Sequence, residues 1–225
     1  GIYVHIPFCK KKCKYCDFIS FSCDEEIYTK YVEALINEIK NTSKNIISSI
    51  HEVSTIYIGG GTPSLIDSKY IEEIIETIYQ NIRVAGNAEI TIEVNPGTVT
   101  REKLETYKKL GINRLSIGLQ TTDNELLSLI GRIHTYEEFL DTYNMAREIG
   151  FANINVDLML ALPTQTEKML VDSLLKVINL NPNHISLYSL ILEEGTVLEK
   201  EIEEGKYKLV DEELERKMYH KTKNI

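Results

Sequence analysis

Ile2-Tyr-Val-His-Ile-Pro-Phe8 leads directly into Cys9-Lys-Lys-Lys-Cys13-Lys-Tyr-Cys16, and this stretch indicates both a strand and the site that follows it. Three of the four cysteines lie within eight residues, straight after an apolar run that is typical of a strand. The spacing C-x3-C-x2-C lets three thiolates come together within one loop. Three thiolates would bind three irons of a [4Fe–4S] cube, which usually has four cysteine ligands, and would leave the fourth iron open to another ligand.

Two other uses of these cysteines have to be weighed. The same three thiolates could bind zinc, with His5 or Cys23 as the fourth ligand, but zinc motifs usually contain a second cysteine pair, which this chain lacks. A disulfide would leave one thiol of the loop unpaired. The spacing therefore favours an iron–sulfur cluster over zinc, and Cys23 receives no role.

The overall composition is ordinary for a globular protein. The chain has 225 residues, of which 43% are hydrophobic and 26% charged, and its net charge is −9 at pH 7. So acidic a chain is not expected to bind nucleic acid, and no apolar run is long enough to span a membrane. Because the few cysteines are mostly clustered, as in proteins of reducing compartments, we expect a cytoplasmic protein.

Short runs rich in Ile, Val, Leu and Tyr alternate with longer amphipathic stretches. The short runs predict strands at residues 2–6, 53–58, 89–94, 114–119, 153–160 and 184–192. The longer stretches predict helices at residues 26–41, 68–82, 101–110, 135–149 and 167–180, with N-caps at Ser68 and Thr100 and C-caps at Gly111 and Gly150. About six βα units with parallel strands are therefore expected, in an α/β fold.

The chain is expected to contain one domain followed by an appendage. No linker-like segment interrupts residues 1–192, which we take as the core, whereas residues 193–225 are charged and predict a solvated, mainly helical appendage. Because the chain starts at Gly1 and stops within a helical pattern, we expect it to be part of a longer protein with a further C-terminal region.

Unusual residues lie at the carboxyl end of each of the first five predicted strands. A doubly wound sheet and a barrel both fit the alternation of strands and helices, but chemistry in a βα barrel collects at this end of the strands. The residues concerned are the cysteine loop, the segment Gly59-Gly-Gly-Thr-Pro63, Glu93, Gln120 with Arg132 nearby, and Asp157. This pattern favours a partial TIM-type barrel with a site at its mouth.

Each of these residue types suits ligand binding, although each also has an ordinary explanation. Consecutive glycines allow a backbone to approach a ligand closely, or simply form a turn. Glu93 could accept hydrogen bonds from ribose hydroxyls or an amine, and Arg132 could bind a carboxylate with both of its terminal nitrogens, or either could be a solvated charge. Asp157 lies in an apolar run, where a carboxylate needs partners.

Taken together, these motifs resemble the radical S-adenosylmethionine (SAM) superfamily. Within it, the chain is similar to the branch that contains the oxygen-independent coproporphyrinogen III dehydrogenase and its haem-chaperone relatives. The residues that carry the resemblance are the cysteine motif with Tyr15, Gly59-Gly-Gly-Thr-Pro63, Glu93, Gln120, Gly131-Arg132 and Asp157 to Pro163, together with Tyr3 to Cys9 and His184-Ile-Ser-x-Tyr188.

The resemblance implies a cofactor site. Cys9, Cys13 and Cys16 would ligate a [4Fe–4S] cluster, and the amino and carboxylate groups of SAM would chelate the open iron. The family's cofactor-binding positions correspond to Tyr3, Tyr15, Gly60, Gly61, Thr62, Glu93, Gln120, Arg132 and Asp157. Glycine backbone would meet the amine, Glu93 the ribose, and Arg132 with Gln120 the carboxylate.

One position indicates which branch of the family the chain resembles. The dehydrogenase motif has a further cysteine two residues after the third, where this chain has Phe18. The chain therefore looks more like the haem-chaperone branch, which binds haem and transfers it to an acceptor protein. There are two alternatives. One is oxidative decarboxylation of coproporphyrinogen III in porphyrin biosynthesis, and the other is a zinc-stabilised barrel that serves only as a binding module. Whether the protein is an enzyme stays open.

Two further features bear on the resemblance. Ala161 and Thr164 stand where the family commonly has glycine, so the loop after the fifth strand is expected to differ. Lys10, Lys11, Lys12 and Lys14 surround the cysteines in an otherwise acidic chain. These lysines either offset the charge of thiolates and cluster or also attract an acidic, flavodoxin- or ferredoxin-like reductant.

Overall fold

A single curved sheet of six parallel strands forms the centre of the molecule. The computed structural model describes residues 1–46 and 52–225. The strands are β1 (Ile2–Ile6), β2 (Val53–Gly60), β3 (Val84–Val94), β4 (Arg114–Gln120), β5 (Asn153–Leu160) and β6 (His184–Ser189), and they are hydrogen-bonded in this same order. A doubly wound sheet would reverse its strand order, whereas a barrel adds each strand beside the preceding one. The predicted partial barrel is therefore confirmed, with β1 and β6 as its outer strands among the described residues.

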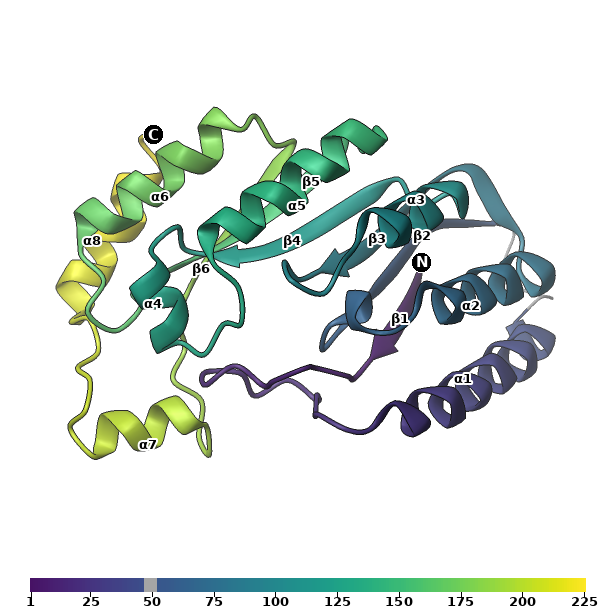
Figure 1. Cartoon of the computed structure of the whole chain (residues 1–225), viewed down its shortest axis with the longest axis horizontal. Coiled ribbons are helices and arrows are strands. Elements are labelled where there is room, and N and C mark those ends of the chain that lie inside the picture. Colours follow the sequence, from purple (N-terminus) through teal and green to yellow (C-terminus); the bar gives the residue numbers. More distant parts are fainter. Residues whose placement is uncertain (47–51) are drawn as a thin grey trace.

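Helices lie around the outside of this sheet (Figure 1). The large ones are α1 (Glu25–Ile46), α2 (Ser68–Asn81), α3 (Arg101–Lys109), α5 (Tyr136–Ile149) and α6 (Glu167–Asn179), close to the predicted positions. Two short elements, the 3-10 helix η1 (Pro63–Leu65) and α4 (Asn124–Leu129), were not predicted. Both are shorter than two full turns, so they leave little periodic signal in the sequence.

Helix ends follow the predicted signals with two exceptions. Gly111 was predicted as the C-cap of α3, but Leu110 is the C-cap and Gly111, with φ 86°, is the next residue. The Thr100 side chain accepts a hydrogen bond from the Lys103 backbone, and Gly150 ends α5 in a left-handed conformation with φ 95°. Ser68 was expected to cap α2, but this prediction is wrong, because Asp67 has the cap and accepts a hydrogen bond from the Lys69 backbone. Asn, Asp and Ser are similarly favoured at this position, so the sequence alone did not decide between the two neighbours.

The last strand is shorter than the expected 184–192. β6 ends at Ser189, and Leu190 makes one more backbone hydrogen bond, to the Leu160 carbonyl, before the chain leaves the sheet. Leu190 and Leu192 do not belong to the strand, and their apolar character is explained by packing elsewhere. They pack in a second hydrophobic cluster together with Leu126, Ile130 and Met159.

The main core lies between the sheet and its outer helices. Strand residues such as Ile58, Ile92 and Ile117 are fully buried and meet the apolar faces of the helices, including Leu104 of α3 and Phe139 of α5. These helical faces follow the period of 3.6 residues that predicted the helices. The core therefore fixes the strands, and with them the carboxyl ends at which the polar residues lie.

The C-terminal segment is helical, as expected, but two of its side chains are buried against the core. It contains α7 (Val197–Glu203) and α8 (Glu212–Thr222). Leu198 of α7 joins the second hydrophobic cluster, and Met218 of α8 packs with Leu160 and Leu170. The prediction of a merely solvated appendage does not hold for these contacts, and the domain boundary at residue 192 stays a prediction.

No helix in the described part of the chain is long and apolar enough to cross a bilayer.

His134 is a buried polar side chain without hydrogen bonds. Its side chain is 3% exposed, and neither ring nitrogen has a hydrogen-bond partner of good geometry. The Leu119 backbone raises the pKa of the ring, but two other causes lower it. Burial first, and the positive charge of Arg132 second, lower the pKa of His134 from 6.5 to about 3. The ring is therefore neutral in the folded protein at any pH near neutrality.

We expect Met218→Ala to lower the free energy of unfolding by about 2–5 kcal/mol, because it removes a fully buried side chain and leaves a cavity. Arg216→Ala on the same helix is the control, since Arg216 is exposed, and it should change stability by less than about 0.5 kcal/mol. Urea unfolding measures both. Equal small effects would show that α8 is only loosely attached.

His134 should make the fold sensitive to mild acid. The unfolded chain takes up a proton near pH 6.5, whereas the folded chain does so only near pH 3, so stability falls as the pH falls through this window. Between pH 7 and pH 5, the wild type should lose about 2 kcal/mol more than His134→Gln does. Chemical unfolding at the two pH values measures the difference, and a pH-independent difference would contradict the lowered pKa.

Candidate functional site

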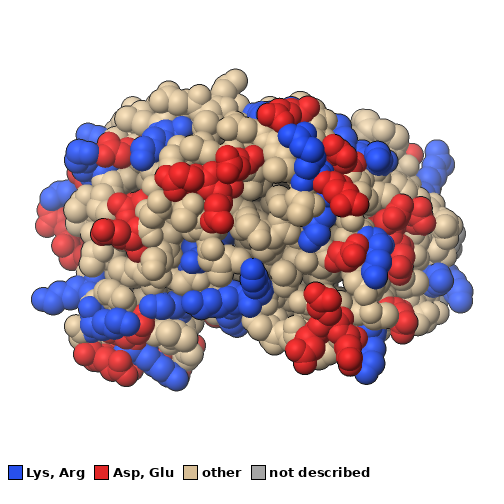
Figure 2. Space-filling model, viewed as in Figure 1, with Lys and Arg blue, Asp and Glu red and all other residues tan. Residues whose placement is uncertain are grey.

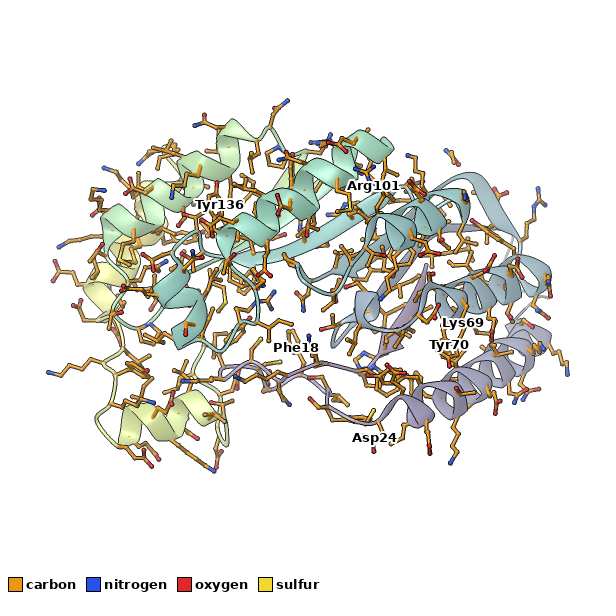
Figure 3. All side chains as sticks on the ribbon, in the orientation of Figure 1. Phe18, Asp24, Lys69, Tyr70, Arg101 and Tyr136 are labelled. Atoms are coloured by element: carbon orange, nitrogen blue, oxygen red, sulfur yellow. The ribbon has the colours of Figure 1, made fainter. Side chains whose placement is uncertain are left out.

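The carboxyl ends of the strands surround a cavity of about 380 Å³, and eleven of the twelve residues predicted for the site line it. Its volume is in the usual range for a small-molecule site. The eleven are Cys9, Cys13, Tyr15, Cys16, Gly60, Gly61, Thr62, Glu93, Gln120, Arg132 and Asp157. Figure 3 shows Phe18, another lining residue, on the loop that faces the strand ends across this opening.

Tyr3 is the predicted residue that does not line the cavity. Its side chain is 60% exposed, its hydroxyl lies 3.0 Å from Nδ1 of His5, and its ring stacks on that of Tyr57. Tyr57 does line the cavity, so Tyr3 lies one layer behind it.

Backbone hydrogen bonds hold the cysteine loop on both sides. On one side, Cys9 donates to the Phe21 carbonyl at 3.0 Å, and Phe21 donates to that of Pro7 at 2.9 Å. On the other side, Lys14 donates to the Ile130 carbonyl at 3.0 Å. All four cysteines are free thiols, so the loop is held by its backbone and needs no disulfide.

The end of β2 touches this loop through glycine. Parallel pairing sets His5 beside Gly59 and Ile6 beside Gly60, and Gly61 then donates a hydrogen bond of 2.8 Å to the Ile6 carbonyl. A Cβ atom on Gly61 would lie 2.9 Å from Sγ of Cys9 and 2.8 Å from the Phe8 carbonyl oxygen. Glycine is therefore required here by a close approach, which is a stronger reason than a turn.

The three thiols can serve a cluster, because each thiolate of a cube binds a different iron. Thr62 Oγ1 donates to Sγ of Cys9 at 3.6 Å, and Arg132 Nη1 donates to Sγ of Cys13 at 3.6 Å. Hydrogen-bond donors therefore already face two of the sulfurs.

The thiols would have to lose protons when they bind iron. Burial is the main reason why the pKa of Cys16 is raised, and the neighbouring Cys13 raises it further. A free Cys16 is therefore protonated near neutral pH, and metal binding would release its proton.

Two carboxylates, Glu93 and Asp157, line the cavity, and strand residues hold both of them. Tyr57 donates to Oε1 of Glu93 at 2.8 Å, and the Gly60 backbone donates to Oε2 at 3.0 Å. Burial is the main cause that raises the pKa of Glu93, and the charge of Asp157 adds to it, while the two hydrogen bonds act in the opposite direction.

Asp157 is held by a residue of the neighbouring strand and by a residue of its own strand. Ser116 of β4 donates to Oδ2 at 3.1 Å, and Asn155 of β5 donates to Oδ1 at 2.8 Å. Ser186 of β6 in turn donates to Oδ1 of Asn155 at 3.0 Å, so three strands fix this carboxylate. The partners that Asp157 was expected to need are present.

The cavity is also lined by a cation, Arg132, one of whose donors has no partner. Arg132 Nη2 donates to Oδ1 of Asn95 and to the Gly118 carbonyl, both at 2.6 Å. Its Nε is buried without a hydrogen-bond partner, so an acceptor is missing at this position. Although burial opposes the charge, Tyr15 and Cys13 keep the pKa of Arg132 above its usual value, and the residue stays cationic.

Gln120 is fixed at the end of β4 in an unusual backbone conformation. Its φ is 78°, which is uncommon for a residue other than glycine, and Tyr188 of β6 donates to its Oε1 at 2.9 Å. The amide nitrogen of Gln120 is therefore the group left to face a ligand.

Sequence reasoning missed several residues that line or support the cavity. They are Tyr57, Asn95, Ser116, Asn155 and Tyr188. Ser116 and Asn155 are polar residues within buried strands, and that was the signal available for them. Tyr57 gave no such signal, because tyrosine is common in any strand. Tyr188 belongs to the motif His184-Ile-Ser-x-Tyr188 of the resemblance, but no site role was predicted for it.

The loop after β5 differs from the expectation. Ala161 and Thr164, which stand where glycine is common in the resembling family, have φ of 60° and 65°. The loop therefore keeps the left-handed backbone that glycine would adopt easily, and the two side chains cost roughly 1–2 kcal/mol each.

Comparisons with known proteins agree with this site. The model of the radical SAM superfamily matches residues 3–177. The chain is 38% identical to the haem chaperone HemW of Bacillus subtilis over 218 residues, which are 96% of this chain and 57% of that protein. It is 39% identical to HemW of Escherichia coli over 198 residues, which are 88% of this chain and 52% of that protein.

Among solved structures, coproporphyrinogen III oxidase (HemN) from Escherichia coli, described as a radical SAM enzyme, aligns with a TM-score of 0.87 and 30% identity. The alignment covers 99% of this chain and 51% of that one. This chain thus spans about half the length of the curated relatives it matches.

The family model covers most of the chain, including the cysteine loop and the strand ends that enclose the cavity. The chain belongs to the radical SAM superfamily, whose members carry a [4Fe–4S] cluster and use SAM.

Proposed function

We propose that Cys9, Cys13 and Cys16 hold a [4Fe–4S] cluster and that the adjoining cavity binds SAM. The observation that carries this proposal is the arrangement of charges in one cavity. Two carboxylates, Glu93 and Asp157, line the same cavity as the cation of Arg132 and the three cysteines of the loop. SAM has a carboxylate, an amine and ribose hydroxyls, so it can satisfy all of these groups at once.

The charged groups of the cavity would bind different parts of SAM. Arg132, which stays cationic, would attract the carboxylate by its charge, with the amide of Gln120 beside it. Glu93 and Asp157 would accept hydrogen bonds from hydroxyl or amino groups, because each carboxylate oxygen still has a lone pair free beyond its contact in the protein. The backbone at Gly60 and Gly61 and the Thr62 hydroxyl complete the wall nearest to Cys9.

When bound and reduced, the cluster supplies the electron with which SAM is cleaved to a 5′-deoxyadenosyl radical, which is chemistry of the cofactors. The residues of this chain position SAM and limit solvent access. The neighbours Tyr15 and Tyr57 keep their hydroxyl protons near neutral pH, because burial raises the pKa of both. They therefore add no further negative charge to the cavity.

We infer that the whole protein is a haem chaperone, with haem as its cargo and an acceptor protein as its partner. The identities of 38% and 39% to two HemW proteins support this choice. Phe18 also supports it, because this position would carry a cysteine in the dehydrogenase motif. A cytoplasmic location, a flavodoxin- or ferredoxin-like reductant and a core of residues 1–192 belong to the same proposal.

The second candidate is oxidative decarboxylation of coproporphyrinogen III. The likeness to coproporphyrinogen III oxidase over nearly the whole chain, with a TM-score of 0.87, favours it. The sequence identity is lower than to the HemW proteins, so we place this activity second.

Full-length protein, reconstituted anaerobically with iron and sulfide, distinguishes the two candidates. We expect it to bind haem stoichiometrically, as followed by the Soret band, and to leave coproporphyrinogen III unchanged in the presence of SAM and a reductant. Product analysis that finds protoporphyrinogen would favour the oxidase. Cys16→Ala is the control for the cluster, since it removes one proposed ligand.

Gly61→Ala should prevent normal assembly of the cluster. The new methyl group would lie 2.9 Å from Sγ of Cys9 and 2.8 Å from a backbone oxygen, so the cysteine loop has to move. We expect the iron and sulfide content after reconstitution to fall several-fold.

Gly86→Ala is the matched control, because its Cβ would have no atom within 4 Å and its backbone is not left-handed. This variant should retain the cluster content of the wild type. Full cluster content in Gly61→Ala as well would argue against the proposed ligand set.

A further inference from the structure

Two of the three cysteines proposed to hold the cluster are the ends of one tight turn. The Cys16 backbone donates a hydrogen bond of 3.2 Å to the Cys13 carbonyl, which closes a turn of four residues. Lys14 and Tyr15 are its two central residues. Because the backbone at the centre of a turn sets the direction of its ends, contacts that fix Lys14 also fix how the two thiols are presented.

The Lys14 backbone is held on two sides by segments that are far away in the sequence. Its N–H donates to the Ile130 carbonyl at 3.0 Å, and its carbonyl accepts a hydrogen bond of 2.8 Å from the backbone of Leu198. Leu198 lies in the first turn of α7, where backbone N–H groups have no partner within the helix. A Cβ atom on Gly131 would lie 3.0 Å from Cγ of Lys14, so the loop at residues 130–131 is in close contact with the turn.

The Lys14 side chain reaches the same helix through a charged contact. Its Nζ lies 2.9 Å from Oε1 and 2.8 Å from Oε2 of Glu201, and the two side chains are 21% and 14% exposed. In every other ion pair of the described residues, at least one partner is more than half exposed. Lys206 also donates to Oε1 of Glu201, at 2.6 Å. Isolated, exposed ion pairs contribute little to stability, whereas this pair is shielded from solvent and belongs to a network.

Helix α7 is itself anchored, so it can hold the turn in place. Leu198 is fully buried in the second hydrophobic cluster, against which Tyr15 and Ile202 also pack. Figure 1 shows α7 beside the loop that follows β1, and Figure 2 shows acidic and basic side chains next to each other at this place. The helix lies beyond residue 177, the last residue that the superfamily model matches, so this contact comes from outside the matched segment.

We propose that Glu201 is a positioning residue for the cluster, because it holds Lys14, and with it the turn that carries Cys13 and Cys16, against α7. This inference deepens the proposed function and rests on it, since it concerns the retention of the cluster. Glu201 does not line the cavity, so it acts through Lys14 alone. Loss of the contact should leave the cavity intact, loosen the turn and make the cluster easier to remove.

A positioning role and a merely structural role of Glu201 have different consequences for the protein without its cluster. If Glu201 only stabilises the fold, Glu201→Gln should lower the unfolding temperature and weaken the protection of all slowly exchanging amides alike. If Glu201 positions the turn, the effect should be local. The backbone amides of Lys14, Cys16 and Leu198 should then exchange faster, while the amides of the central strands keep their protection.

Full-length protein with its reconstituted cluster is treated with an iron chelator, and loss of the cluster is followed by its visible absorbance. Glu201→Gln should speed this loss by about three- to five-fold, because the turn opens more often without the ion pair. Lys14→Met should have a similar effect, since it keeps the apolar stem of the side chain and removes the charge. The double variant should be no faster than either single variant, because both remove the same contact.

Glu203→Gln is the matched control, since Glu203 lies on the same helix, is exposed and forms no ion pair within the described residues. This variant should lose the cluster at the wild-type rate. An unchanged rate in Glu201→Gln, equal acceleration in Glu203→Gln, fully additive single effects or a uniform loss of amide protection would each overturn the proposal. Wild-type protein that forms no cluster would instead contradict the proposed function, and amide exchange in the cluster-free protein would still test the hold of Glu201 on the turn.

Discussion

The close approach of the β2 end to the cysteine loop is the constraint on which the site depends. Parallel register sets Gly59 and Gly60 beside the last residues of β1, and Gly61 continues this contact through its hydrogen bond to Ile6. No side chain fits at Gly61, because a Cβ would collide with Cys9 and with the backbone of Phe8. The same backbone segment donates to Glu93 from Gly60, so one glycine run fixes a cysteine of the loop and a carboxylate of the next strand.

The charged groups of the cavity are likewise held by residues of the strands. Glu93 is held by Tyr57 of the neighbouring β2, and Asp157 is held by Ser116 of the neighbouring β4 and by Asn155 of its own strand, β5. Arg132 comes from a loop instead, and it is held by Asn95 and Gly118 at the ends of two further strands. These contacts satisfy most but not all of the hydrogen-bonding capacity of the charged groups. The buried Nε of Arg132 is the clearest remainder, since it has no hydrogen-bond partner.

Much of this architecture could be predicted from the sequence, because it rests on local patterns. Strands β1 and β5 were predicted with their observed bounds, and the residues at strand ends meet because parallel strands place their carboxyl ends together. Three kinds of feature could not be predicted. The contacts of Tyr57 and Tyr188 depend on which strands are neighbours in space, the packing of Met218 depends on long-range contact, and the left-handed Ala161 and Thr164 contradict local preference. Such local strain persists only where the surrounding structure determines the backbone, which here is a loop beside the cavity mouth.

The lysines of the cysteine loop illustrate why composition alone does not assign a role. Four identical side chains within five residues read as one positive cluster, yet the fold gives them different environments. Lys14 turns toward α7 and joins the C-terminal segment to the loop through Glu201, and Lys12 closes the loop on itself at Phe18. Lys10 and Lys11 remain exposed, and Lys11 also lines the cavity. Two of the four lysines therefore keep the shape of the loop, whereas the other two have no ion pair in the described residues, a difference that depends on contacts far apart in the sequence.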